Sequence, residues 1–525
     1  MDLKVDLLRP QAYGGLRPGR IDLVETHISL VFLTDRDVFK VKKPVDLGFV
    51  DFRTVKQRKA ACDAEVLLNV RLAPEVYRGV VPIRRGQDGG CRVDAEGPIV
   101  DWAVHMTRLP DECRADLLLA RGGLTSDAID AVAERIATFH AVARTDQATA
   151  AFGTTEAIEY NIHENLAQTR GRIEKYVSPE ESEEIARWQL AFVRGHDELF
   201  AKRIEAGRIR DGHGDLRLEH VYLGQSEKPT IIDCIEFNDR FRFGDVCADI
   251  AFLSMDLAAH GRVDLAERLL ARYARDANDF DLYALVDFYE SYRAYVRGKI
   301  AALVAGEGWD GPASASRDAR RYFLLALSAE RRAMLLPAVI AIGGVIASGK
   351  STIAEQASLE LSAPIVDADR TRKGMLGVES ARPIDEPPWH GAYEPAFTDR
   401  VYAEVLRRAE IVVASGRPVV IDASFGSRAM RSAAQDLACR HNVPFRFVEC
   451  RADPSVCRSR LTQRAIHRGV SDGRLEVFDA FCARYEAVDE LSPDDHLVLD
   501  TTRPLGESIA ALRARLECWP QGFFA

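Results

Sequence analysis

The stretch Gly344-Val345-Ile346-Ala347-Ser348-Gly349-Lys350-Ser351 has the spacing G-x-x-x-x-G-K-S. The apolar run 338–342 before it predicts a buried strand, and residues 352–361 after it have the pattern of a helix. The two glycines let backbone N–H groups converge on one point, and the helix N-terminus adds partial positive charge there. The stretch therefore predicts a loop that holds the phosphates of a nucleoside triphosphate.

The residue types in this loop indicate separate tasks. Lys350 can reach the β- and γ-phosphates, and the Ser351 hydroxyl can ligate Mg²⁺. The residues expected to bind ATP here are Gly344, Ser348, Gly349, Lys350, Ser351 and Thr352. The alternative, a glycine turn with a chance Lys-Ser pair, does not account for the strand before it and the helix after it.

Strand and helix patterns alternate through the rest of the chain. The predicted strands are residues 338–342, 364–366, 418–421, 445–449 and 496–499. Because helical stretches separate them, residues 336–525 predict an α/β P-loop domain of three layers with a mostly parallel sheet.

Charged side chains follow two of these strands. Asp369 and Arg372 come after the second strand, and ligands of open α/β sheets bind beyond the carboxyl ends of the strands. We expect Asp369 to accept a proton from a substrate hydroxyl and Arg372 to clamp an anion. Asp422 ends the third strand and is predicted to contact Mg²⁺ through water. For either carboxylate alone, a helix N-cap is the alternative interpretation.

Three arginines recur every four residues near the C-terminus, at Arg460, Arg464 and Arg468. This spacing places them on one face of a helix. One interpretation is a lid that brings cations to the phosphates, with Ser471-Asp472-Gly473-Arg474 as its mobile end. A solvated basic face is the alternative.

Composition limits the class of protein. The chain has 525 residues and a net charge of −10, which favours two to four domains and argues against bulk nucleic-acid or membrane binding. A nucleic-acid substrate stays open for the P-loop domain. Ten cysteines without C-x-x-C pairs indicate reduced thiols and a cytoplasmic location. The longest apolar stretch, 333–347, is broken by Pro337 and two glycines and is too short to span a bilayer. No oligomeric state can be predicted.

The first half has a different pattern. Paired strands are expected within 21–43, a helix over 54–72, further strands at 76–83 and 99–106, and mostly helices over 125–305. This predicts an α+β domain over residues 1–310, with an N-lobe to about 105 and a C-lobe over about 106–305. Residues 306–335 would form a linker and a connecting helix, with the helix over about 318–335.

The segment His213-Gly214-Asp215-Leu216-Arg217-Leu218-Glu219-His220 interrupts the helical region, and Ile231-Ile232-Asp233 follows it. Two acidic groups at adjacent strand ends could together hold a metal and a substrate hydroxyl, as phosphoryl transfer requires. A polar loop with buried Asp partners is the alternative.

This segment resembles the catalytic loop H-x-D-L-x-x-x-N of aminoglycoside phosphotransferases and protein kinases. The resemblance implies that Asp215 orients or deprotonates the acceptor hydroxyl, that Arg217 faces the γ-phosphate, and that Asp233 binds metal. His220 stands where the family has a metal-binding asparagine, although Mg²⁺ prefers oxygen ligands. Glu236 is close enough in sequence to share the metal role, and Asp245 and Asp249 are expected to support the loop.

The same resemblance implies a lysine and a glutamate in the N-lobe. Lys40 takes the family position on a strand, and Lys42, on the same face, is the runner-up. Glu65 is the expected partner. The alternative is a Lys-rich edge strand with a solvated helix Glu.

The second half is similar to small P-loop kinases of the gluconate kinase, polynucleotide kinase, chloramphenicol phosphotransferase and zeta-toxin group, whose Asp-x-x-Arg motif is matched by Asp369 and Arg372. The whole chain resembles a fusion of the two kinds of domain. The resemblance implies a bifunctional enzyme that transfers the ATP γ-phosphoryl group, with Mg²⁺, to small hydroxylated acceptors. The alternative is an ATP-binding regulatory protein in which only the P-loop domain is catalytic and the first half is a pseudokinase or nucleotidyltransferase.

Overall fold

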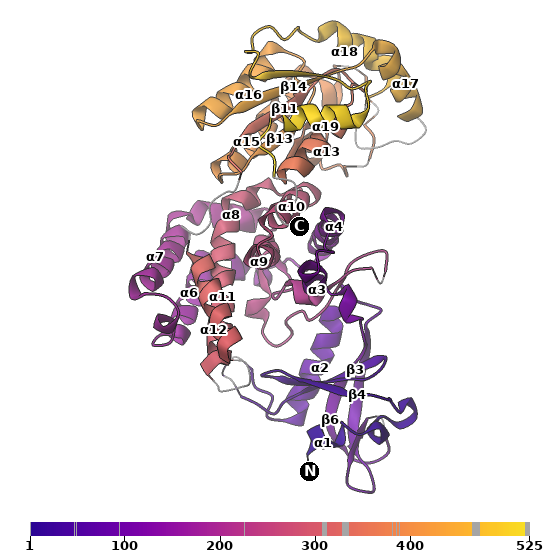
Figure 1. Ribbon diagram of the computed structural model, residues 1–525, viewed down its shortest axis with the longest axis vertical. Coiled ribbons are helices and arrows are strands. Elements are labelled where there is room, and N and C mark those ends of the chain that lie inside the picture. Colours follow the sequence, from indigo (N-terminus) through magenta and orange to yellow (C-terminus); the bar gives the residue numbers. More distant parts are fainter. Residues whose placement is uncertain are drawn as a thin grey trace. The chain divides into compact units, whose positions relative to one another are not determined.

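The computed structural model describes residues 2–519 except 47, 49, 94, 225, 307–311, 328–334, 381, 385, 388 and 465–472. The chain forms two compact units, Met1–Asp256 with Tyr292–Ala319 and Leu257–Ser291 with Arg320–Ala525 (Figure 1). Residues 257–291 therefore pack with the second unit, whereas the sequence analysis placed them in the first domain. Among the described residues, no helix combines the length and the apolar character needed to cross a bilayer.

The first unit opens with an antiparallel sheet of six strands in the order β1-β2-β3-β6-β4-β5. Their bounds are β1 Asp22–Glu25, β2 Ser29–Leu33, β3 Asp37–Lys42, β4 Tyr77–Arg85, β5 Cys91–Val93 and β6 Ile99–Thr107. Helix α2 (Val55–Asn69) begins at a capping box of Thr54 and Gln57 and packs its buried Cys62 against β3, β4 and β6. This packing fixes the helix that carries Glu65 beside the strand that carries Lys40.

The remainder of the first unit is mostly helical, as predicted. Its helices, after the short α1 (Leu3–Asp6), are α3 Ala115–Ala120, α4 Ser126–Val142, α5 Gln147–Ala150, α6 Thr155–Thr169, α7 Pro179–Gly195 and α8 Asp197–Glu205. Two short antiparallel ribbons flank the segment 213–220. One pairs β7 (Ile209–Asp211) with β10 (Phe243–Asp245), and the other pairs β8 (Val221–Tyr222) with β9 (Thr230–Ile231). Helices α9 (Val246–Ala259), α11 (Val286–Gly306) and α12 (Pro312–Ala326) each have residues in both units.

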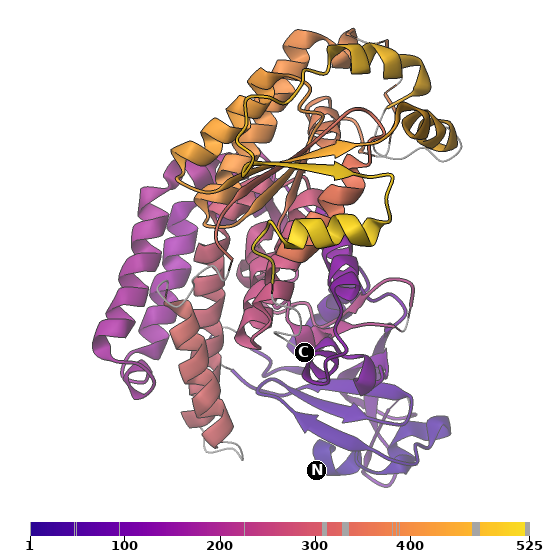
Figure 2. The ribbon, with the colours of Figure 1, turned by 45° about the horizontal axis from the view of Figure 1, so that its top comes forward.

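The second unit contains a parallel sheet of five strands in the order β12-β13-β11-β14-β15. The strands are β11 Val339–Gly343, β12 Ile365–Asp367, β13 Val419–Asp422, β14 Phe445–Arg451 and β15 His496–Asp500. All five were predicted from the sequence. One face packs Ile340, Ile342 and Val420 against α13 (Lys350–Leu361) and α19 (Leu505–Arg513), and Figure 2 shows helices on both faces. The predicted α+β unit followed by a three-layer α/β unit is therefore confirmed.

The helices wholly within this unit are α10 Val263–Asp276, α13 Lys350–Leu361, α14 Ala368–Met375, α15 Pro395–Ala414, α16 Arg428–Arg440, α17 Pro454–Arg464, α18 Phe478–Arg484 and α19 Leu505–Arg513. The connecting helix expected over 318–335 begins earlier, at Pro312, and α12 ends at Ala326. The expected linker is also shorter, because α11 reaches Gly306; residues 307–311 and 328–334 lie outside the described residues.

Candidate functional site

The loop between β11 and α13 takes the shape that its glycines permit. Gly344, Ala347 and Gly349 all have positive φ, of 137°, 62° and 91°. A Cβ at Gly344 would lie 2.4 Å from the Cys450 carbonyl oxygen, so no larger residue fits there. The loop therefore lies close against the end of β14 and leads directly into α13 at Lys350.

Polar groups in this loop suit an anion. Lys350 Nζ donates to the Val345 carbonyl oxygen at 3.1 Å, within the loop itself. The Ser348 hydroxyl is fully buried and forms no hydrogen bond in the described structure. A buried polar group without a partner is costly, and a phosphate oxygen would supply one. The residues present thus fit a bound triphosphate.

Asp422 lies buried at the end of β13. Burial raises the pKa of Asp422, while the Lys350 charge and the nearby Ser351 hydroxyl oppose this rise. Its neighbour across the strands is Asp367, whose pKa burial and the Asp422 charge raise to about 6. A hydroxyl and carboxylate oxygens are ligands that suit Mg²⁺. The described residues contain no group of three His, Cys, Asp or Glu side chains placed to hold a metal, so phosphate oxygens and water would complete the coordination.

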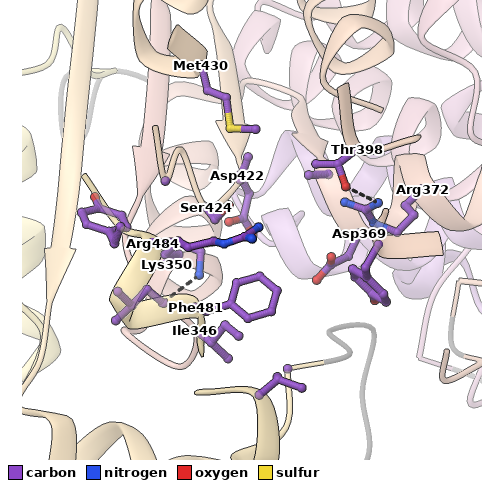
Figure 3. Close-up of a pocket in the computed structure, with 18 of the residues that line it drawn as sticks. Ile346, Lys350, Asp369, Arg372, Thr398, Asp422, Ser424, Met430, Phe481 and Arg484 are labelled. Carbon is purple, nitrogen blue, oxygen red and sulfur yellow. Dashed lines mark hydrogen bonds between the residues drawn. The ribbon is translucent and has the colours of Figure 1, made fainter. Parts of the chain in front are cut away.

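A cavity of about 460 Å³ joins this loop to the residues that follow β12. Lys350, Ser351 and Asp422 line it, and so do Asp369, Arg372 and Thr398. Figure 3 shows Lys350 and the Asp369–Arg372 pair on different sides of the open space. The structure thus brings Gly349, Lys350 and Ser351 of the predicted phosphate site into one cavity with the predicted acceptor residues, whereas Gly344, Ser348 and Thr352 are not among the residues that line it.

Arg372 is a buried cation in this cavity, only 5% exposed. Its Nη1 donates to the Ala392 carbonyl oxygen at 2.5 Å and contacts Thr398 Oγ1 at 3.4 Å, and its guanidinium lies over the Tyr393 ring. Its Nε is buried and has no hydrogen-bond partner among the described residues. A buried donor of a guanidinium that is left unsatisfied is unfavourable, so an anionic ligand group that accepts from it would stabilise the site.

An aromatic part of the cavity wall was not predicted from the sequence. Trp389 stacks on Phe481 with a ring centroid distance of 4.8 Å, and the Arg484 guanidinium lies 3.9 Å from the Trp389 ring centroid. All three line the cavity, together with Met430. Figure 3 labels Phe481, Arg484 and Met430 among the residues around the cavity. Phe481 and Arg484 belong to α18, far from Trp389 in sequence, and no local pattern links them.

The arginines of α17 lie differently from one another. Arg464 lines the cavity, as expected for a lid. Arg460 instead donates to the Ala347 and Thr501 carbonyl oxygens at 3.1 and 2.7 Å, so it supports the phosphate loop through the backbone and is not among the cavity residues. The helix ends at Arg464, and Arg468, Ser471 and Asp472 lie outside the described residues. Gly473 and Arg474 line the cavity, and Arg474 donates to the Glu386 carbonyl oxygen.

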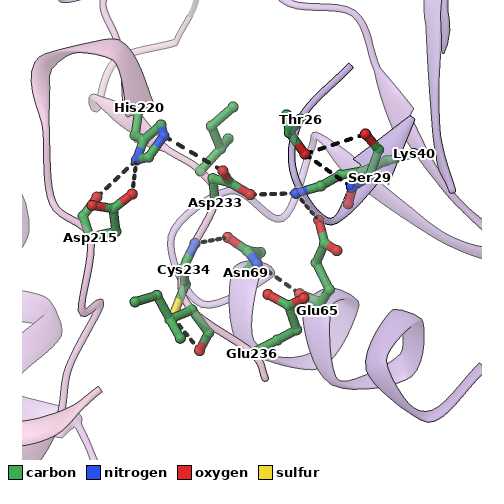
Figure 4. Close-up of polar contacts among 12 residues, drawn as sticks. Thr26, Ser29, Lys40, Glu65, Asn69, Asp215, His220, Asp233, Cys234 and Glu236 are labelled. Atoms are coloured by element: carbon green, nitrogen blue, oxygen red, sulfur yellow. Dashed lines mark hydrogen bonds and ion pairs between the residues drawn. The ribbon is translucent and has the colours of Figure 1, made fainter. Parts of the chain in front are cut away.

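In the first unit, Lys40 lies between two carboxylates. Its Nζ is 2.9 Å from Glu65 and 2.5 Å from Asp233. Figure 4 shows this chain of contacts continuing from Asp233 to His220 and Asp215. Burial alone would lower the pKa of Lys40, but Asp233 and Glu65 outweigh it and hold the pKa well above its usual value. The structure therefore groups the lysine, the glutamate and the metal candidate that the resemblance implied.

Lys42 forms a second buried pair beside the first. Its Nζ lies 2.6 Å from Glu65 and 2.5 Å from Glu236, and the Glu236 side chain is 4% exposed. The Glu236 carboxylate therefore neutralises a buried lysine, and this pairing competes with the metal role that was expected of it beside Asp233. Spacing in sequence placed Glu236 near Asp233 but could not predict which lysine it would face.

His220 lies between the two acidic residues of this site. Its Nδ1 donates to the Asp215 carbonyl oxygen at 2.8 Å, which leaves Nε2 facing Asp233 Oδ2 at 3.5 Å. Arg217 donates to both carboxylate oxygens of Asp215 at 2.9 Å. Burial raises the pKa of Asp215, but Arg217 and His220 outweigh it and hold the pKa well below its usual range. The imidazole nitrogen of His220 and the carboxylate of Asp233 fit a divalent cation. Mg²⁺ binds the imidazole more weakly than the carboxylate.

One of the two acidic residues expected to support this loop contacts it directly. Asp249 accepts from the backbone N–H groups of His213 and Gly214 at 2.5 and 2.9 Å. Asp245 instead forms a buried bidentate pair with Arg203 and accepts from the Cys247 N–H, so it joins α8 to the start of α9.

Comparisons with known proteins match the second unit separately and also most of the chain. A family model described as an AAA domain matches residues 339–488, the region of the phosphate loop and the cavity. The uncharacterized protein Rv2004c of Mycobacterium tuberculosis is 35% identical over 468 residues, which are 88% of this chain and 90% of that protein. The uncharacterized protein Mb2027c of Mycobacterium bovis matches to the same extent.

The chain belongs to the family of these mycobacterial proteins. Solved structures match its parts. Aminoglycoside 2'-phosphotransferase-IIIa, in its GDP complex, is 13% identical, covers 58% of this chain and 93% of its own, and has a TM-score of 0.35. A gluconokinase from Sinorhizobium meliloti is 21% identical, covers 35% of this chain and 94% of its own, and has a TM-score of 0.25.

Proposed function

We propose that the second unit transfers the γ-phosphoryl group of Mg·ATP to a hydroxyl of a small acceptor that also carries an anionic group. The observation that supports this most directly is the shared cavity, lined by Lys350, Ser351 and Asp422 and also by Asp369 and Arg372. The acceptor binds with its hydroxyl at Asp369. The carboxylate or phosphate group of the acceptor pairs with the buried guanidinium of Arg372.

In this reaction the acceptor oxygen forms a bond to the γ-phosphorus as the bond to the β–γ bridging oxygen breaks. Asp369 takes the hydroxyl proton, and ADP leaves with the bridging oxygen. Lys350 offsets the negative charge on the β- and γ-phosphates, where it is worth most in the transition state. Mg²⁺, held by Ser351 and through water by Asp422, would neutralise further phosphate charge.

We propose that the first unit holds a second Mg·ATP site. Lys40, positioned by Glu65, binds the phosphates, and Asp233 with His220 holds the cation. Asp215 orients the acceptor hydroxyl, and Arg217 faces the γ-phosphate. A specific observation favours a second candidate, a regulatory unit without transfer activity: both carboxylate oxygens of Asp215 already accept from Arg217.

The test is transfer of label from γ-³²P-ATP by the intact chain to a panel of hydroxy acids, sugar phosphates and neutral polyols. We expect label on an anionic acceptor. Lys350→Ala should lower turnover at this site at least 100-fold, because the lost cation faces charge that grows in the transition state. Asp369→Asn should lower transfer similarly while Mg·ATP affinity stays within about twofold. Arg372→Gln should raise the acceptor KM, since it removes the charge that pairs with the anion.

Two results would contradict this assignment. One is a neutral polyol as the preferred acceptor, which would remove the role of Arg372. The other is transfer that survives Lys350→Ala and Asp369→Asn but stops with Asp215→Asn, which would place the chemistry in the first unit. Conversely, unchanged transfer with Asp215→Asn would support the regulatory candidate for that unit.

A further inference from the structure

Helix α10 and the turn after it belong to the second unit, although they precede its phosphate loop in the chain. We call α10, the turn at Asn278 and the 3₁₀ helix η7 (Phe280–Ala284) the bracing segment, residues 263–284. It lies outside the matched region 339–488 and outside every motif of the P-loop half. Its polar side chains nevertheless reach the two helices that carry the candidate site.

The bracing segment contacts α13, the helix that begins at Lys350. Arg275 Nη1 forms an ion pair with Glu355 at 2.5 Å. About two helical turns earlier in α10, on the same face, Arg268 Nη1 donates to the buried Ser358 hydroxyl at 3.1 Å. Two charged donors therefore hold the helix that presents the phosphate-binding lysine and serine.

The same segment also contacts α14, the helix that carries Asp369 and Arg372. Asn278 accepts from Arg408 Nη1 at 2.7 Å, and the same nitrogen lies 3.4 Å from the buried Thr371 hydroxyl. A Cβ at Gly374 would lie 2.8 Å from Asn278 Nδ2, so this part of α14 lies directly against the asparagine. Thr371 and Gly374 are three residues apart and share a face of α14 that differs from the face of Asp369 and Arg372.

We propose that Arg275 and Asn278 are positioning residues that fix α13, on the phosphate side, relative to α14, on the acceptor side. In-line transfer needs the reacting atoms about 3–3.5 Å apart, and a displacement of about 1 Å lowers the rate about 100-fold. One rigid segment that contacts both helices restricts such displacement. The contacts of Arg275 and Asn278 do not depend on the function proposed above; only their effect on catalysis rests on it.

The test uses the intact chain and four variants, one of them a double variant and one a control. Asn278→Gly removes the amide and keeps the backbone, because Asn278 has a φ of 48° that glycine adopts without strain. Arg275→Glu places like charges together, and adding Glu355→Arg restores an ion pair of opposite polarity. Asp281→Asn is the matched control in the same segment, since its ion pair with Arg407 is about half exposed on both sides.

We expect Asn278→Gly to lower kcat about tenfold and to raise the acceptor KM, with Mg·ATP affinity unchanged. Hydrogen exchange should become faster in residues 368–375. Arg275→Glu should lower kcat and accelerate exchange in residues 350–361, and the double variant should recover most of both. Asp281→Asn should match the wild type.

Wild-type kcat and exchange in Asn278→Gly and Arg275→Glu would overturn the proposal. So would a loss of thermal stability, Mg·ATP affinity and kcat in equal proportion, because that pattern indicates general destabilisation. If the wild type transfers phosphate to no acceptor, the proposed function fails. In that case hydrogen exchange alone tests the bracing role. Faster exchange in α14 of Asn278→Gly and in α13 of Arg275→Glu supports the role, and unchanged exchange overturns it.

Discussion

Glu65 is fully buried between Lys40 and Lys42, and each lysine has a second carboxylate, Asp233 or Glu236. Glu65→Gln removes the shared charge and leaves two buried ammonium groups with less compensation. We expect the first unit to lose about 3 kcal/mol of unfolding free energy, together with most of its Mg·ATP affinity. Urea unfolding measures the change in unfolding free energy, and hydrogen exchange in α2 measures it within the first unit.

Asp63→Asn on the same helix is the control for this prediction. Asp63 pairs with Lys59 at the surface, so its loss should cost less than about 1 kcal/mol. Equal effects of the two substitutions would show that Glu65 contributes no more than an exposed ion pair.

His213 makes the first unit sensitive to acid. Burial lowers the pKa of His213 to about 4; its Nε2 donates to the Ile232 carbonyl oxygen, and Nδ1 accepts from the Asp215 N–H. In the unfolded chain the His213 side chain binds a proton near pH 6.5. The free energy of unfolding is therefore at its full value above pH 6.5 and falls by about 3 kcal/mol in total as the pH is lowered to about 4. His213→Gln, which does not titrate, should remove this part of the pH dependence. Parallel pH profiles for the two proteins would contradict the account.

At the scale of elements, Arg417 connects the start of β13 to the segment that precedes the phosphate loop in sequence. Its guanidinium pairs with Glu267 of α10 at 2.7 Å and with Asp287 of α11 at 2.8 Å. Arg417→Ala should destabilise the second unit by about 2 kcal/mol, because both carboxylates lose a largely buried partner. Arg407→Ala, which breaks the exposed pair with Asp281, should change stability by less than about 1 kcal/mol. Thermal unfolding of the intact variants measures both, and equal shifts would contradict the prediction.

The elements that could be predicted from sequence are those with a local signal. The strands of the second unit are short apolar runs, buried on both faces, and β3 with α2 had clear strand and helix periodicity. Lys40, Glu65 and Asp233 could be grouped only through the family resemblance. The pairing of Glu236 with Lys42, the support of the phosphate loop by Arg460 and the cavity wall of Trp389 and Phe481 depend on contacts between distant segments. No periodicity or spacing encodes such contacts.

At the scale of the whole molecule, the two units differ from the two halves of the sequence. The second unit includes residues 257–291, which the helical pattern alone assigned to the first domain. Helical periodicity shows that a segment has an apolar face, but it does not show which core that face joins. Experiments on single sites are therefore best made in the intact chain, with point substitutions in place of truncation at residue 310 or 336.

The central claim is that each unit binds its own Mg·ATP, and the number of nucleotides bound at saturation tests it most directly. Equilibrium binding of Mg·ATP to the intact chain should give two sites. Asp233→Asn should remove the site in the first unit and leave the site in the second. Asparagine accepts the positive φ of 65° at this position. Lys350→Ala should remove the site in the second unit and leave the site in the first, and the double variant should bind no Mg·ATP. A single site in the wild type, or two sites that persist in either single variant, would contradict the account.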